Sequence, residues 1–263
     1  MIGEWTAPAV RARALASRRI GRERVRAVAT SPTLAAALAV LADTPYGRDL
    51  TPGMTLAIAG RAVWSTLLWH LRILAGWSPA AGMNRVRLLA GGFEIANVVG
   101  YLAQLDGFSA APPFELGRLE TAWRNVRRVT TAAEVRRALA RSGWGDPAGE
   151  SPAIVAAALQ SAWARRVSLE VPEARPWATA FESLLRARAQ PADGNAPQWL
   201  DEASIWRAME AQALAMGAGW RPGPSAIVAT AGLLAADAWR TRAALEIAAR
   251  GGAHDAEVLD AVA

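Results

Sequence analysis

The chain has 263 residues, of which 52% are hydrophobic and 20% are charged. This length and composition fit an ordered globular protein made of one large domain or of two to three small helical units. The chain has no cysteine, which excludes disulfides, thiolate zinc sites and thiol nucleophiles, and no lysine, which excludes a Walker A motif and a Schiff base. All 29 basic residues are arginine, and the formal net charge of +6 implies a mild attraction to anionic partners.

Strong helix formers dominate the chain, and the alternating pattern of β-strands is nearly absent. Capping residues, prolines and the helical spacing of apolar residues predict the elements of the first half. In chain order these are a helix over 8–28, a short helix capped by Thr30 or Ser31, helices over 52–75 and 81–105, and a linker at 110–113.

The second half continues in the same way, so the sequence predicts an all-α protein, a multi-helix bundle. The elements expected there are helices over 116–126, 132–141, 152–169 and 173–188, a linker at 190–197, helices over 200–216 and 225–250, and a short helix after Gly252.

The N-terminal region offers no apolar run, because arginines such as Arg11 and Arg13 interrupt it, and we expect no signal peptide. The longest uncharged stretches, Ile73–Asn84 and Pro222–Ala236, fall short of the roughly 20 apolar residues that span a bilayer. We therefore expect a soluble cytoplasmic protein, and docking onto a membrane protein at the periphery of the cytoplasmic membrane stays open.

An internal repeat is the most informative feature of the sequence. Residues 26–38 align with 127–139, and both segments place a threonine where a short helix would be capped. After a small gap, Thr-Pro-Tyr-Gly at 44–47 meets Ser-Gly-Trp-Gly at 142–145. The recurrence of cap and turn in the same order indicates duplication, although chance similarity between alanine-rich helices remains the alternative.

The repeat predicts two to three related helical units. We place the first at 1–110, the second at 111–194 and a shorter third at 195–263, and the three could pack as one domain. Gly219 and Trp220 belong to the fainter third copy.

No group of residues in the sequence predicts a catalytic, cofactor-binding or metal-binding site. There are only two histidines, His70 and His254, which excludes zinc sites built on several histidines. Glu94 and Asn97 are three residues apart, on one face of a helix, and we interpret them as a structural polar pair. General-acid chemistry would require a second group opposite Glu94, and the sequence identifies none. A small-molecule pocket around Glu94, Asn97 and His70 remains an alternative.

The arginine clusters raise a second alternative, a helical protein that binds nucleic acid. Such basic faces can neutralise phosphates. The sequence has no recognition motif and few tyrosines or phenylalanines, so a solvated or protein-docking face is favoured and we do not expect nucleic acid as the partner. The clusters comprise Arg11, Arg18, Arg22 and Arg26 on the first predicted helix, and Arg124, Arg127, Arg128, Arg136, Arg137 and Arg141.

Four short motifs resemble the C/d rotor-cap family of V-type and A-type rotary ATPases. They are the arginine-rich helix segment Val10–Leu15, the turn Leu41–Gly47, the segment Phe93–Val99 with its Glu-x-x-Asn spacing, and the final long helix at Trp239–Ile247. The resemblance covers most of the chain. The chain is shorter than typical members, and the polar residues usual in the last long helix are mostly missing at 235–241.

The resemblance implies a non-enzymatic subunit that takes part in ion or proton transport. Members of this family form a funnel of three related helical units that links the central stalk to the membrane rotor ring. The implied partners are the stalk and ring subunits of the ATPase, with no cofactor. The residues expected to contact them are Arg18, Arg22, Tyr46, Trp144 and Trp220.

Overall fold

The computed structural model describes residues 3–189, 198–219, 221–253 and 258–260. In this part of the chain all regular structure is helical and there is no strand, which confirms the predicted all-α class. The expected linker at 190–197, Trp220 and His254 lie outside the described residues.

The chain divides into two compact units. Unit 1 comprises Met1–Trp77 and Gln190–Ala263, and unit 2 comprises Ser78–Ala189. These units group helices by contact. The sequence-based division into 1–110, 111–194 and 195–263 groups them by repeat instead, and it stays a prediction.

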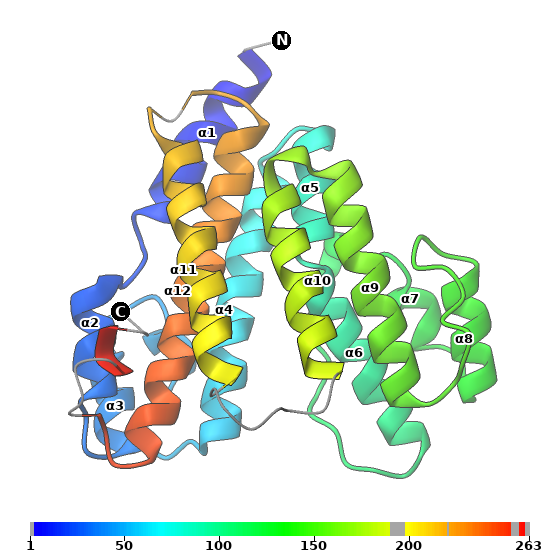
Figure 1. Cartoon of the computed structure of the whole chain (residues 1–263), viewed down its shortest axis with the longest axis horizontal. Coiled ribbons are helices and arrows are strands. Elements are labelled where there is room, and N and C mark those ends of the chain that lie inside the picture. Colours follow the sequence, from blue (N-terminus) through cyan, green and yellow to red (C-terminus); the bar gives the residue numbers. More distant parts are fainter. Residues whose placement is uncertain (1–2, 190–197, 220, 254–257, 261–263) are drawn as a thin grey trace. The chain divides into compact units, whose positions relative to one another are not determined.

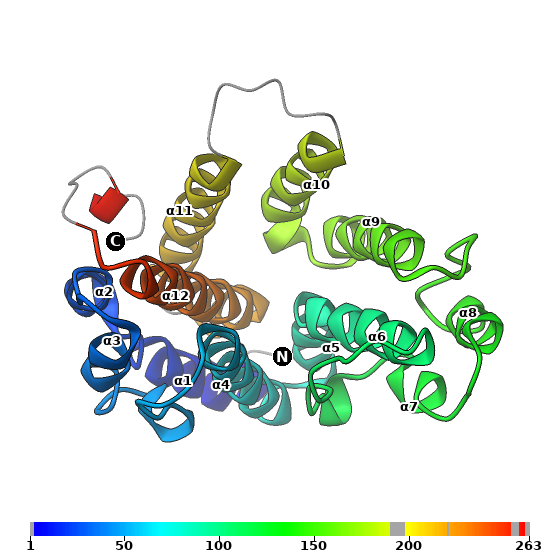
Figure 2. The same ribbon diagram turned by 90° about the horizontal axis from the view of Figure 1, so that it is seen from below.

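Unit 1 is built around its last helix, α12 (Pro224–Ala249), which is buried along most of its length. In the part of the unit that the structure describes, this helix packs against five others, which surround it in Figure 2. Those helices are α1 (Gly3–Ala16), α2 (Gly21–Ala29), α3 (Leu34–Val40), α4 (Leu56–Gly76) and α11 (Gln198–Gly217). On the α11 side, the rings of Trp206 and Trp239 stack with centroids 5.8 Å apart.

Unit 2 is built around α9 (Pro152–Glu170), which packs against three other helices (Figure 1). These are α5 (Ala80–Leu89), α6 (Gly91–Leu105) and α10 (Arg175–Ala189). The short helices α7 (Trp123–Val126) and α8 (Ala132–Ala140) contact each other and α6. Turns of 3₁₀ helix lie at Gly117–Leu119 and Pro172–Ala174 in this unit and at Gly47–Asp49 in unit 1, where residues 258–260 are also helical.

The helix predicted over 8–28 is wrong as one element, because the chain bends between α1 and α2. Gly21 has a φ of +77°, a left-handed conformation that glycine adopts at no steric cost. The N–H of Ile20 leaves the helical pattern and donates to the side chain of Asp237 on α12. A long-range contact therefore holds the start of α2, four residues after α1 ends.

The helix predicted over 81–105 is also broken, at Ala90, and the axes of α5 and α6 differ by 48°. The indole N–H of Trp163 donates to the Leu88 carbonyl at 2.7 Å, which competes with a continuous helix. Gly91 allows the close approach, because a Cβ there would lie 2.6 Å from a ring carbon of Trp163. The helix predicted over 116–126 shrinks to the 3₁₀ turn and α7.

Candidate functional site

Glu94 lies in the first turn of α6 and is 1% exposed. Its Oε1 accepts backbone N–H groups from Ala122 and Trp123, each at 2.6 Å, and from Thr121 at 2.9 Å. Its Oε2 accepts the indole N–H of Trp144 at 3.1 Å. The carboxylate therefore satisfies the free N–H groups at the start of α7 together with one distant side chain. This network explains how a carboxylate can be buried here.

Asn97 lies one turn after Glu94 and is also buried. Its amide N–H donates to the Phe114 carbonyl at 2.9 Å, and its Oδ1 accepts the Phe114 N–H at 2.6 Å. The two side chains of one α6 face thus hold the loop that leads from α6 to α7. Both side chains bind backbone groups of unit 2 itself.

The turn that follows α8 positions the Trp144 indole. The hydroxyl of Ser142 donates to the Leu139 carbonyl at 2.7 Å and accepts the Trp144 N–H at 3.1 Å. Gly145 then adopts a φ of +79°. This local arrangement presents the ring to Glu94, 50 residues earlier in the sequence.

Asp237 is the corresponding buried carboxylate of unit 1, on α12, and is 4% exposed. It accepts the Ile20 N–H at 3.1 Å and the phenol O–H of Tyr46 at 2.8 Å. Burial raises the pKa of Asp237, and the hydrogen bonds from Tyr46 and Ile20 offset only part of that rise. Burial, and then the charge of Asp237, raise the pKa of Tyr46 well above its usual value. The phenol therefore remains a donor.

The turn that carries Tyr46 has the same hydrogen bonds as the turn that carries Trp144. The hydroxyl of Thr44 donates to the Leu41 carbonyl at 2.6 Å and accepts the Tyr46 N–H at 3.3 Å. A Cβ on Gly47 would lie 2.1 Å from the Ala42 carbonyl oxygen, so the position after the aromatic residue requires glycine. We call each set of a buried carboxylate, a helix start and a turn aromatic a carboxylate clamp.

The Tyr46→Phe variant should be less stable than the wild type by about 1–2 kcal/mol, because Asp237 loses a buried donor. Urea unfolding followed by tryptophan fluorescence measures the change. Tyr101→Phe is the matched comparison, since Tyr101 donates to the neutral carbonyl of Val129, and we expect a smaller loss there. An unchanged midpoint for Tyr46→Phe would show that the Asp237 hydrogen bond contributes nothing.

A third buried carboxylate, Glu210 on α11, binds three arginines. Arg240 of α12 donates Nη1 to Oε1 at 2.6 Å and Nη2 to Oε2, and Arg19 donates Nη1 to Oε1 at 3.0 Å. The Nη2 of Arg22 lies 3.9 Å from Oε2. Burial alone would raise the pKa of Glu210, but Arg240, Arg19 and Arg22 together lower it, so the group stays ionised.

His70 lies on α4 and is 5% exposed. Burial, and then the charge of Arg18, lower the pKa of His70 to about 4, against an opposing hydrogen bond with the Thr66 backbone. The imidazole is therefore neutral near pH 7, and its edge faces the ring of Trp69.

The low pKa of His70 predicts a pH dependence of stability. Between pH 6.5 and 4 the unfolded chain binds more protons at this position than the folded chain. The stabilising contribution is therefore lost as pH falls through this window. In His70→Gln the free energy of unfolding should fall less steeply over the same range, as urea titrations at several pH values would measure. Equal slopes for the two proteins would contradict the assignment.

The structure places the five expected contact residues in different surroundings. Arg18 and Arg22 are exposed, near the bend between α1 and α2, whereas Tyr46 and Trp144 are buried within clamps. Trp220 lies outside the described residues. As contacts to a partner, all five stay predictions.

Sequence reasoning missed the buried charges of unit 1. Asp237, Arg240 and Glu210 were not expected to form a group, although each interrupts an apolar helix face. An ionisable residue on such a face requires a partner when it is buried, and this signal was present in the sequence.

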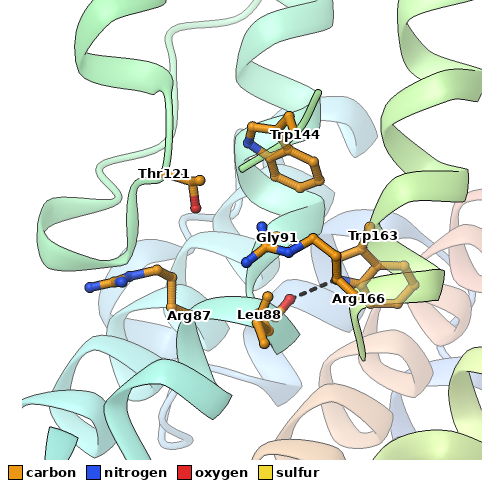
Figure 3. A pocket seen from close by; sticks show the side chains of 7 residues that line it. All are labelled: Arg87, Leu88, Gly91, Thr121, Trp144, Trp163 and Arg166. Atoms are coloured by element: carbon orange, nitrogen blue, oxygen red, sulfur yellow. Dashed lines mark hydrogen bonds between the residues drawn. The ribbon is translucent and has the colours of Figure 1, made fainter. Parts of the chain in front are cut away.

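Unit 2 has a shallow hollow next to its clamp, shown in Figure 3. Its lining consists of Arg87, Leu88, Gly91, Thr121, Trp144, Trp163 and Arg166. Within this lining, the indole N–H of Trp163 donates to the Leu88 carbonyl. Among the residues that the structure describes, no three His, Asp or Glu side chains gather as metal ligands. The polar groups of the lining are the guanidinium groups of Arg87 and Arg166, the hydroxyl of Thr121 and the two indole N–H groups.

Within the described ranges no single helix has both the length and the apolar character to cross a membrane, although the bent pair α5 and α6 meets both criteria when taken together. Comparison with known proteins adds no assignment, because neither a protein-family model nor a curated protein matches the chain.

Proposed function

We propose that the chain is a non-catalytic structural subunit of a V/A-type rotary ATPase that links the central stalk to the membrane rotor ring. The observation that carries the proposal is the carboxylate clamp found in both units. It supports an architecture of related helical repeats, which is what the resemblance to the C/d rotor-cap family implies. The proposed location is cytoplasmic, peripheral to the membrane.

The clamps correspond element by element. In unit 2, Glu94 binds the start of α7 and the indole of Trp144. In unit 1, Asp237 binds the start of α2 and the phenol of Tyr46. In each turn, a Ser or Thr hydroxyl two residues before the aromatic residue accepts the backbone N–H of that aromatic residue. A shared pattern of long-range hydrogen bonds supports duplication over chance similarity of alanine-rich helices.

The order of these elements in the sequence supports two repeats, each of which ends with a helix that binds the first residues of the other repeat. Glu94 precedes the segment that it holds, whereas Asp237 follows its segment by about 190 residues. A repeat that starts near residue 20 and ends with α6 would thus be followed by one that starts near 121 and ends with α12. The last helix of each repeat holds the start of the other.

A torque-transmitting part must be stiff, and the interior of each unit supports this role. Buried polar groups such as Glu94, Asn97 and Glu210 are held by several hydrogen bonds each. Satisfied networks of this kind rigidify a core. The same bonds oppose an enzymatic role, because the oxygens of Glu94 already accept four donors of the chain itself.

Several arginines of the two basic clusters form ion pairs with carboxylates of the chain itself. Arg26 pairs with Asp260, Arg136 with Asp146, and Arg124 with Glu120. A phosphate-binding stripe needs several unengaged cations in a row. No observation favours the nucleic-acid or small-molecule alternative over the structural role.

Deletion of the gene in the native cells tests the proposal. Inverted membrane vesicles from the deletion strain should lose ATP-driven uptake of the transported ion, and a plasmid copy should restore it. Respiration-driven uptake in the same vesicles controls for leaks. Unchanged ATP-driven uptake in the deletion strain would reject the rotor role.

A further inference from the structure

Near the bend between α1 and α2, guanidinium groups outnumber the buried carboxylates that they approach. Arg19, Arg22 and Arg240 all approach Glu210. The nearby Asp237 does not balance them directly, because its oxygens accept Ile20 and the phenol of Tyr46. Three guanidinium groups therefore share one carboxylate.

Arg22 is the least engaged of the three. Oε1 of Glu210 is taken by Arg240 and Arg19, and Oε2 by the second nitrogen of Arg240. The Arg22 nitrogen stays 3.9 Å away, beyond hydrogen-bond distance, and 71% of its side chain is exposed. Arg22 is thus a largely exposed cation that makes only a long contact with this cluster.

The size of this surplus suits a protein carboxylate better than a polynucleotide. Along α2 the next arginine on the face of Arg22 is Arg26, which pairs with Asp260, and Arg24 pairs with Asp43. Arg18, at the end of the turn after α1, is also exposed, and its charge acts on His70 of α4. One or two free guanidinium groups can bind a carboxylate in a forked geometry, whereas they cannot follow a phosphate backbone.

We propose that Arg22, which lies beside the Arg19–Glu210–Arg240 cluster, is the docking point for an acidic segment of a partner protein. This inference rests on the proposed function, in which the partner is a stalk or ring subunit. The buried cluster holds α1, α2, α11 and α12 in place, so the exposed guanidinium is presented on a rigid base.

The test uses the full chain and two fluorescent probes of equal length, a hexaglutamate peptide and hexauridylate RNA, with binding followed by anisotropy at low salt. Arg22→Gln should weaken peptide binding about tenfold, which is typical for the loss of a charge-assisted hydrogen bond. Arg13→Gln, on the exposed face of α1, is the matched control for net charge and should change affinity less than about twofold.

Two results would overturn the inference: equal peptide affinity for the Arg22→Gln and Arg13→Gln variants, or tighter binding of the RNA than of the peptide. Arg22→Gln should keep the wild-type urea midpoint, because the side chain is exposed, and this check separates lost binding from lost folding. If ATPase subunits are recovered with the native protein but the two variants bind the peptide equally, the docking point is wrong and the rotor role stands. If Arg22→Gln weakens peptide binding but no ATPase subunits are recovered with the native protein, the rotor role is rejected and the docking point stands.

Discussion

Replacing Glu94 with leucine should destabilise unit 2 by about 3–5 kcal/mol, the largest effect expected from any single polar side chain in that unit. Leucine has a similar size but accepts no hydrogen bond, so the N–H groups of Ala122 and Trp123 and the Trp144 indole would be buried without partners. Urea unfolding followed by far-UV circular dichroism measures the change in midpoint and slope.

Glu170→Ala is the control for Glu94→Leu. Glu170 forms an exposed pair with Arg166 at a spacing of four residues, and its loss should cost less than about 0.5 kcal/mol. Because the chain has two compact units, the transition can have two steps, and only the step that reports unit 2 should move. A loss below about 1 kcal/mol for Glu94→Leu would show that the clamp is not important for stability.

The Arg240→Met variant should lose about 3 kcal/mol of unfolding free energy, because Glu210 stays buried without the arginine that binds both of its oxygens. Arg19 still donates to Glu210, which keeps the loss at the lower end of what a broken buried pair costs. Chemical denaturation in urea again provides the measurement.

A double variant separates the attraction of this pair from the cost of burying a lone charge. Arg240→Met with Glu210→Met replaces both charges by apolar groups and should recover much of the stability. If the double variant is as unstable as the sum of the single variants, the pair has no coupling and its geometry does not govern the packing of α11 on α12.

The fold class and most helices could be predicted from the sequence because their signals are local. Thr131 does cap α8, because its side chain accepts the Glu134 N–H, whereas α3 is capped by Thr33 and not by Thr30 or Ser31 as expected. The breaks at Ile20 and Ala90 could not be predicted in this way. Each depends on a side chain from a distant helix, Asp237 and Trp163, that captures a backbone group of the helix.

The candidate site shows the same division between local and distant information. The spacing of Glu94 and Asn97 predicted that they share a helix face, and both do hold the loop after α6. Their partners at Phe114 and Trp144 depend on the path of the chain between helices, which no local pattern specifies. The alignment of the turns at 44–47 and 142–145 was the one sequence signal that reached across this distance.

The most direct test of the rotor role is to isolate the tagged protein from its native cells in gentle detergent and to identify its partners by mass spectrometry. The proposal predicts co-purification of the catalytic-head, central-stalk and membrane-ring subunits of a V/A-type ATPase at comparable amounts. Recovery of the chain without any of these subunits, from cells that express the ATPase, would contradict it.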